Sequence, residues 1–129
     1  CMPYFCGAGF AMEIKTHTIN EHSIAEVVSD QIVFRTTQEA VEVMMNCYYN
    51  GASKMIVYEQ HLPAEFFDLK TGFAGDVLQK FSTYQIQLAI VGDFTKYTSK
   101  SLKDFIYESN QMKRINFVGS LEEALDRLK

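Results

Sequence analysis

Short apolar runs that alternate with amphipathic stretches dominate the second half of the chain. Four-residue apolar runs, the last broken once by Asn116, lie at 55–58, 88–91 and 115–118. Runs of this kind are typical of parallel strands that are covered on both faces of a sheet. Helical periodicity predicts helices between and after these strands, at 65–84, 101–110 and 121–128. Such strand, helix, strand units place their strands in one sheet through right-handed crossovers.

The N-terminal part of the chain shows strict alternation instead. From Met12 onward, successive side chains alternate between the two faces of a strand. A second extended stretch, 22–29, follows a tight connection at Asn20-Glu21, which predicts an antiparallel hairpin. Residues 32–34 are predicted to add a short further strand.

A helix is predicted to begin at Thr36, because Glu39 three positions later completes a capping box. It ends at Asn50-Gly51, since both residues tolerate the left-handed conformation of a C-cap. Its apolar face is predicted to lie on the sheet and to comprise Val41, Met44, Met45 and Tyr48. The capping spacing recurs before the last two predicted helices, at Ser101 with Asp104 and at Ser120 with Glu123.

Together these elements predict a single α/β domain. It has a mixed sheet of about five strands with an N-terminal β-hairpin and four helices, which lie mainly on one face of the sheet. The domain is predicted to span residues 12–129. Residues 1–11 carry neither charge nor periodicity, and we interpret them as an upstream leader or a cloning-derived segment, with Met12 as the natural start.

Composition and charge narrow the classes of function. The 129 residues are 47% hydrophobic, which is enough for one core, and carry a net charge of -4, which gives no basic field for nucleic acid. No uncharged apolar run approaches the ~18 residues of a membrane-spanning helix. The three cysteines are odd in number and form no Cys-x-x-Cys pair, which favours a reducing compartment and hence the cytoplasm. We expect neither a metal site nor a cofactor.

Candidate ligand-binding residues follow the predicted parallel strands, because open α/β sheets bind ligands at the carboxyl ends of their strands. The residues there that could contact a small molecule or a phosphate are Glu59, Gly92, Asp93, Lys96 and Ser99. Glu59 and His61 could also form an acid–base pair, although a solvated loop is the plainer interpretation. Asp93 could equally be a turn residue.

A second candidate site lies near the start of the helix predicted at 65–84. It comprises Asp68, Lys70, Thr71 and Gly72. An exposed Thr71 hydroxyl there would place a phosphoryl group against the positive end of a helix dipole. The alternative is structural, because Gly72 and Gly75 each cost about 1 kcal/mol relative to alanine in a helix, and close packing on the sheet would explain them.

Motifs that define enzyme classes are absent from the sequence. Gly7-Ala8-Gly9 lacks the third glycine of a dinucleotide fingerprint, and the chain has no Walker loop, no G-x-S-x-G elbow and no paired histidines for zinc. The balance favours a protein without enzymatic activity.

Three stretches closely resemble the bacterial domain of unknown function family 4180, over essentially Met12 to Lys129. They are FFDLKTGFAGDVLQKFSTYQIQLAIVGDF at 66–94, SLKDFIYESN at 101–110 and FVGSLEEAL at 117–125. The element order and the last helix are more remotely similar to the STAS domains of anti-sigma-factor antagonists. In those domains a Ser or Thr at the N-terminus of the second helix is phosphorylated by a partner kinase, which switches binding. Thr71-Gly72 is similar to their Ser-Gly, so the resemblance implies a switch at Thr71.

Two hypotheses of function follow. The first is a non-enzymatic, STAS-like regulatory or protein-interaction module, switched around Thr71. The alternative is a domain, enzymatic or not, that binds a small molecule or a phosphate-bearing ligand at the carboxyl ends of the parallel strands. We expect a protein partner or a homodimer, the latter through Met44, Met45 and Tyr48, and no nucleic acid or membrane partner.

Overall fold

The computed structural model describes residues 13–19, 21–29, 32–49, 51–112 and 115–128 of the chain. The interpretation of residues 1–11 as a leader or a cloning-derived segment concerns a part of the chain outside these ranges.

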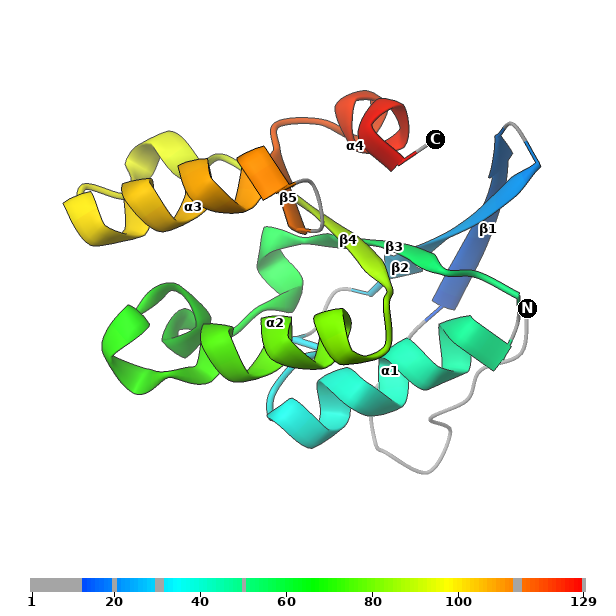
Figure 1. Ribbon diagram of the computed structural model, residues 1–129, viewed down its shortest axis with the longest axis horizontal. Helices are drawn as coiled ribbons and strands as arrows, with labels where there is room; N and C mark the ends of the chain where they lie inside the picture. The colour runs from blue at the N-terminus through cyan, green and yellow to red at the C-terminus, as the bar shows by residue number, and fades with distance from the viewer. Residues whose placement is uncertain (1–12, 20, 30–31, 50, 113–114, 129) are drawn as a thin grey trace.

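Five strands in the described ranges form one mixed sheet in the order β1-β2-β3-β4-β5 (Figure 1). Strands β1 and β2 form the predicted antiparallel hairpin, and β2, β3, β4 and β5 run parallel to one another. The predicted α/β fold with a mixed sheet is therefore confirmed. The strand bounds are Glu13–Ile19, His22–Val28, Lys54–Tyr58, Gln87–Val91 and Ile115–Val118.

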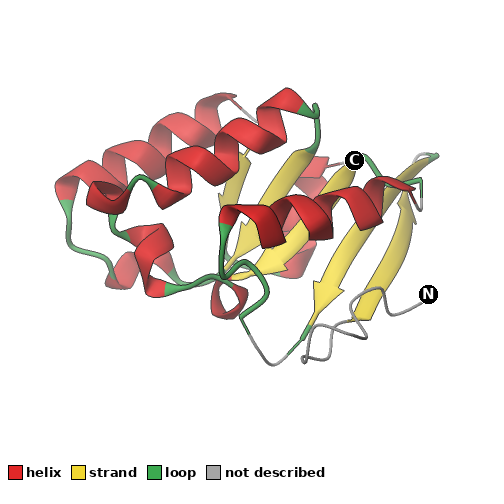
Figure 2. Ribbon diagram, turned by 90° about the horizontal axis from the view of Figure 1, so that it is seen from below, coloured by secondary structure: helices red, strands yellow, loops and turns green. Residues whose placement is uncertain are grey.

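Four α-helices accompany the sheet in the described part of the chain. Their bounds are Thr37–Tyr49 for α1, Phe73–Thr83 for α2, Lys100–Met112 for α3 and Leu121–Leu128 for α4. The first three connect neighbouring parallel strands, so right-handed crossovers place them on the same face, over the larger core. Helix α4 follows the last strand and packs on the opposite face, where Ala124 and Leu128 share a core with Ile56 (Figures 1 and 2).

Residues 32–34 do not form the predicted strand. Val33 and Phe34 are fully buried, and their backbone N–H groups both donate to the carbonyl oxygen of His61, at 3.0 and 3.2 Å. The prediction was wrong because two consecutive amides that share one acceptor anchor a loop and leave no ladder to a neighbouring strand.

The buried face of α1 differs from the prediction. Thr36 does cap this helix, because the Glu39 N–H donates to its Oγ1 at 3.1 Å. The buried side chains, however, are Ala40, Val43, Met44 and Cys47, while Tyr48 is 53% exposed. Ala40 and Cys47 complete a regular i, i+3, i+4, i+7 stripe with Val43 and Met44. The prediction missed this stripe because larger apolar residues lie beside it on the same helix. Met44 is fully buried and is unavailable to the predicted homodimer surface.

The single helix predicted at 65–84 is divided into three parts. Two 3-10 turns, η2 (Ala64–Phe67) and η3 (Leu69–Thr71), precede α2. Gly72 separates η3 from α2 with a φ of +75°, a left-handed conformation that favours glycine. A Cβ at Gly72 or Gly75 would meet nothing within 4 Å, so close packing on the sheet explains neither residue.

The last two helices test the capping predictions. Helix α3 is capped by Ser99 and not by Ser101, because the Leu102 N–H donates to Ser99 Oγ at 3.3 Å. Two serines lie two positions apart here, and the helix begins after the first. Helix α4 has its predicted cap, since the Glu123 N–H donates to Ser120 Oγ at 3.1 Å.

Candidate functional site

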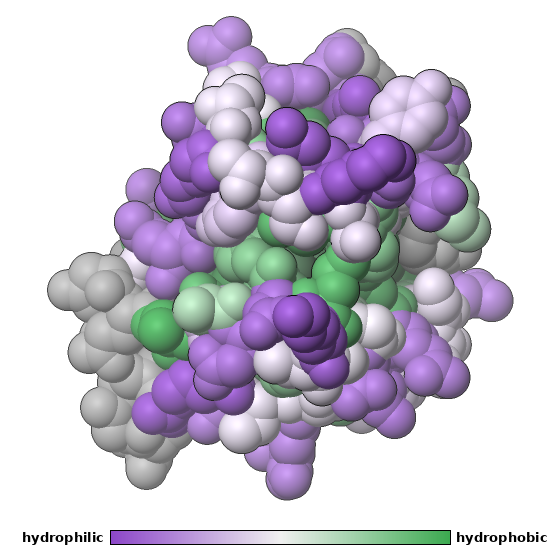
Figure 3. Space-filling view, turned by 90° about the vertical axis from the view of Figure 1, so that its left-hand side faces the viewer, coloured by the Kyte–Doolittle hydropathy of each residue, from purple (hydrophilic) through white to green (hydrophobic). Residues whose placement is uncertain are grey.

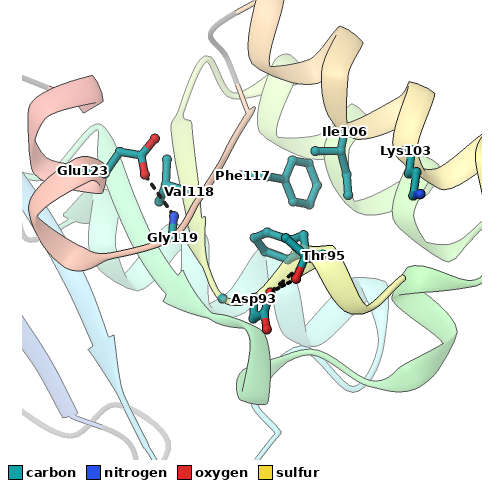
Figure 4. A pocket seen from close by; sticks show the side chains of 10 residues that line it. Asp93, Thr95, Lys103, Ile106, Phe117, Val118, Gly119 and Glu123 are labelled. Atoms are coloured by element: carbon teal, nitrogen blue, oxygen red, sulfur yellow. Dashed lines mark hydrogen bonds between the residues drawn. The ribbon is translucent and has the colours of Figure 1, made fainter. Parts of the chain in front are cut away.

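A crevice of about 560 Å³ opens at the carboxyl ends of β4 and β5, between α3 and α4 (Figure 4). Its origin is topological. The connection after β4 leads to α3 on one face of the sheet, whereas the connection after β5 leads to α4 on the other face. The two connections therefore diverge, which is the arrangement that creates ligand sites in open α/β sheets.

The floor of the crevice is apolar and its rim is polar. Phe117 and Val118 of β5 are 5% and 2% exposed, and the half-buried Phe94 and Ile106 extend the floor. Exposed polar side chains surround this floor: Asp93, Thr95, Lys103 and Glu123.

Hydrogen bonds fix one oxygen of each carboxylate in the crevice. Asp93 Oδ1 accepts from the hydroxyl and the backbone N–H of Thr95, at 2.6 and 3.1 Å, and these bonds hold the pKa of Asp93 below its ordinary value. Glu123 Oε1 accepts from the Gly119 N–H at 3.1 Å. The second oxygen of each carboxylate has no hydrogen-bond partner among the described residues, so both oxygens can accept from a ligand.

Glu59 positions the loop that forms one edge of the crevice. It lies in η1 (Glu59–His61), directly after β3. Its Oε2 accepts from Lys96 Nζ and from the Tyr97 hydroxyl, both at 2.6 Å, and its Oε1 accepts from the Asp93 N–H at 3.3 Å. Burial alone would raise the pKa of Glu59, but the bonds from Lys96 and Tyr97 outweigh it and lower that pKa. We call these three bonds the Glu59 clamp.

Gly92 lies directly after β4 and allows Glu59 to approach the loop. A Cβ at this position would lie 2.6 Å from Glu59 Cβ and 2.7 Å from Glu59 Oε1. A Cβ essentially never makes contacts this short in proteins, so a side chain at Gly92 would displace the clamp.

Aromatic side chains support the same loop from beneath. Phe94, in η4 (Phe94–Lys96), meets Phe117 edge-on with ring centroids 5.2 Å apart. Phe67 stacks on Tyr97 at 4.9 Å. Asn110 of α3 fixes the backbone of Phe117, because its Oδ1 accepts from the Phe117 N–H at 2.7 Å and its Nδ2 donates to the Phe117 carbonyl at 3.3 Å. The crevice is thus built on ordered surroundings.

Four of the five predicted ligand residues lie together: Glu59, Gly92, Asp93 and Lys96. The fifth, Ser99, caps α3 and does not line the crevice. The floor residues Ile106 and Phe117 and the rim residue Glu123 were not among the predicted ligand residues. A signal for Glu123 was present, because its capping spacing follows directly on a predicted parallel strand.

The second predicted site lies at η3 and the start of α2. Thr71 is exposed. Its hydroxyl donates to the carbonyl oxygens of Glu65 and Asp68, which lie 2.8 and 2.9 Å from Oγ1. The same oxygen accepts from the Phe73 N–H at 3.2 Å. The Lys70 N–H donates to Asp68 Oδ1 at 3.1 Å. These bonds order the segment around an accessible hydroxyl.

A second groove, of about 520 Å³, brings part of this segment close to the start of α3. It is lined by Phe67, Asp68, Leu69, Lys70, Ser99 and Ser101. Figure 3 shows hydrophobic side chains at the bottom of a hollow with hydrophilic side chains around it, on the side where η3 and the start of α3 lie. Ser99 therefore lies with Asp68 and Lys70 and not with Glu59.

His61 is not an acid–base partner of Glu59. Its ring is fully buried, and Nδ1 accepts from the Tyr58 N–H at 3.0 Å. The ring proton is therefore on Nε2, which donates to the Ser29 carbonyl at 2.8 Å. Burial lowers the pKa of His61, although the Ser29 carbonyl and the Glu26 carboxylate oppose the shift. Glu26 itself accepts from the Tyr58 hydroxyl at 2.6 Å.

Metal sites and reactive thiols would be further candidate sites in the described ranges. No cluster of three or more His, Cys, Asp or Glu side chains in them could hold a metal ion. The free Cys47 is buried, and burial raises the pKa of its thiol to about 12. No helix in the same ranges has the length and apolar character needed to cross a membrane.

The fold and the crevice define an α/β domain with a ligand-type crevice at the carboxyl edge of a mixed sheet. Residues 19–128 match the family described as a domain of unknown function, DUF4180, and the chain belongs to that family. This match confirms the resemblance to family 4180, while the likeness to STAS domains stays a prediction. No curated protein and no solved structure matches the chain.

Replacing Gly92 with alanine should lower the free energy of unfolding by about 1–3 kcal/mol, because the new Cβ overpacks against Glu59. Urea denaturation followed by circular dichroism measures the change. Gly119→Ala is the matched control, since a Cβ there meets only Glu123 Oε1, at 3.8 Å. Equal stability of the two variants would show that the approach of Glu59 does not require glycine.

Acidification should destabilise the protein through His61. The unfolded side chain takes up a proton near its ordinary pKa of 6.5, whereas the buried ring, with its lowered pKa, takes one up only at lower pH. Stability is therefore fully present above pH 6.5 and is lost as the pH falls below it, with a slope of at most about 1.4 kcal/mol per pH unit.

The measurement is urea denaturation at a series of pH values between about pH 7.5 and pH 5.5. His61→Gln should flatten the pH dependence, and His22→Gln, at an exposed position, should leave it as in the wild type. An unchanged slope in His61→Gln would exclude His61 as its source.

Proposed function

We propose that this protein binds a small organic molecule in the crevice at the carboxyl ends of β4 and β5, and that its function is binding and not catalysis. The crevice itself is the observation that supports this proposal. Its volume of about 560 Å³ suits a small organic ligand. It also lies where open α/β sheets bind their ligands, at strand ends whose connections diverge to opposite faces.

The chemistry of the residues that line the crevice also supports a binding function. An apolar floor removes hydrophobic ligand surface from water, and a few polar groups at the rim fix the orientation of the ligand. Two carboxylates, a hydroxyl and an ammonium group stand at this rim, and the described lining includes neither an imidazole nor a thiol. Such a set can fix the orientation of a ligand, and it lacks the imidazole and the thiol that act as base and nucleophile in many hydrolases.

The phosphate form of the hypothesis receives less support. Lys96 is engaged by the Glu59 carboxylate, and Ser99 is engaged in capping α3. Of the lysines between 94 and 103, only Lys103 lines the crevice, together with two carboxylates. The geometry therefore favours an organic ligand that does not depend on a phosphate group.

We propose the STAS-like switch at Thr71 as a second function, because the hydroxyl is exposed immediately before α2. Phosphorylation would remove the hydroxyl hydrogen that Thr71 donates to the carbonyls of Glu65 and Asp68. The added charge would lie near the positive end of the α2 dipole and beside Lys70, so it would remodel η3 without unfolding the helix. A partner that contacts η3 would detect this change.

A ligand that binds in the crevice should lose affinity when the crevice is narrowed. We expect a thermal-shift screen of small organic molecules to yield ligands that raise stability, by about 2.7 kcal/mol at 100 times the dissociation constant. Gly119→Leu should weaken their binding at least roughly tenfold, a loss of about 1.4 kcal/mol, because Gly119 lines the crevice and a leucine there would take up part of its volume.

Gly75→Leu is the matched control for this experiment. Gly75 is exposed on α2 and does not line the crevice, so this variant should bind as the wild type does. A Cβ meets nothing within 4 Å at Gly75 and only Glu123 Oε1, at 3.8 Å, at Gly119, so neither position is overpacked at Cβ and both variants should fold. A screen without ligands, or ligands that bind Gly119→Leu unchanged, would refute the proposed function.

The switch at Thr71 predicts a single added phosphate after incubation with ATP and a lysate of the source cells, detected by mass spectrometry. Thr71→Val should remove the modification. Thr83→Val should keep it, since Thr83 is exposed at the opposite end of the same helix. Modification at Thr83 or elsewhere, with Thr71 unmodified, would exclude this switch.

A further inference from the structure

We infer that the crevice selects an organic amine, with a protonated ammonium group joined to an apolar body. This inference rests on the proposed function and specifies the ligand class of the same site. Three observations support it: the charges at the rim, the hydrogen bond that the Gly119 backbone N–H already makes before α4, and the aromatic floor.

The charges at the rim favour a cation. Asp93 and Glu123 bring two negative charges to the crevice and Lys103 brings one positive charge, which leaves a net charge of -1 among its lining residues. Hydrogen bonds from Thr95 keep Asp93 ionised by lowering its pKa. Asp93 Oδ2 and Glu123 Oε2 have no hydrogen-bond partner in the described ranges, and an ammonium group carries three donors that could meet them.

The backbone N–H of Gly119, which lines the crevice and could donate to an anionic ligand, already has a hydrogen-bond partner within the protein. The Gly119 N–H, in the turn between β5 and α4, donates to Glu123 Oε1 at 3.1 Å. Backbone N–H groups in such turns are common partners of phosphates and carboxylates in α/β folds. Here the protein supplies its own carboxylate, so an anionic ligand would have to displace Glu123 as well as overcome its charge.

The floor suits an apolar body that carries such a cation. Phe94 and Phe117 meet edge-on, with centroids 5.2 Å apart, beside the buried Val118. A ring or an alkyl chain laid on this surface would lose contact with water. The faces of aromatic rings also attract an ammonium group within about 6 Å of their centroids, so the floor tolerates the charge.

Tryptamine and indole-3-propionate test the sign of the ligand charge, because they share ring and chain length and differ in an ammonium or a carboxylate group. Binding to the full chain is measured by isothermal titration calorimetry and by chemical-shift changes. We expect tryptamine to bind at the crevice and to lose affinity in Gly119→Leu. We expect indole-3-propionate to bind at least roughly tenfold more weakly than tryptamine.

Charge variants identify the groups responsible. Asp93→Asn and Glu123→Gln remove charge but keep the oxygens that accept from Thr95 and Gly119, so both should fold. Each should weaken tryptamine binding roughly fivefold, as expected for an exposed ion pair. Lys103→Gln should strengthen it. Glu122→Gln is the matched control, because Glu122 lies next to Glu123 and outside the lining.

The outcomes separate this inference from the proposed function. If indole-3-propionate binds as tightly as tryptamine and is sensitive to Gly119→Leu, the amine inference is overturned and the binding function stands. Failure of tryptamine to bind also overturns the inference. If Lys103→Gln weakens tryptamine binding, the assigned charge pattern is wrong. If no compound of any charge binds in a way that Gly119→Leu abolishes, the proposed function itself fails.

Discussion

Right-handed crossovers between sequential parallel strands place α1, α2 and α3 on one face of the sheet. The opposite face would then expose a row of apolar strand residues, among them Ile56, Ala89 and Val118. Helix α4 covers this row with Ala124 and Leu128, and it can do so only by leaving β5 toward that face. The crevice is the space that remains where this last connection separates from the one before it. The need to bury the second face of the sheet thus determines where a ligand can bind.

The shape of the crevice depends on a second constraint, the Glu59 clamp. One carboxylate from the end of β3 accepts hydrogen bonds from three consecutive parts of the loop after β4, at Asp93, Lys96 and Tyr97. These bonds stabilise the negative charge of Glu59 and hold Asp93 at the rim of the crevice. Burial raises the pKa of Tyr97, and the hydrogen bond to the Glu59 carboxylate raises it further, so this phenol stays protonated. Glu59 is therefore a positioning residue, and of the residues that it holds, Asp93 is the one that lines the crevice.

Local sequence patterns predicted most of the fold. Apolar runs identified the parallel strands β3, β4 and β5, and the spacings at Thr36 and Ser120 identified two helix caps that the structure contains. The errors arose where local patterns are degenerate. Ser101 has an acidic residue three positions later and Ser99 does not, so the spacing favoured Ser101, although the helix begins at Lys100 and Ser99 caps it. The break at Gly72 depends on a backbone angle that a helical pattern does not reveal.

The candidate site could be predicted only in part. Residues placed directly at a strand end, such as Glu59 and Asp93, follow from sheet topology alone. Ile106, Phe117 and Glu123 come from three different elements, and their meeting depends on how far α3 and α4 are rotated and where they cross the sheet. The rotation and crossing position of each helix are determined by side-chain packing. The periodicity of a single sequence carries no information on how its side chains pack together.

Asn110 has a consequence for the behaviour of the protein in concentrated solution. Strand β5 is the last in the sheet order, and the backbone groups of Phe117 that bond to Asn110 are no longer free to pair with another chain. Exposed strand edges are templates for intermolecular β-sheet growth and aggregation. One amide side chain from α3 therefore occupies the backbone groups of Phe117 at this edge, and the same contact that orders the crevice floor disfavours pairing of a further strand there.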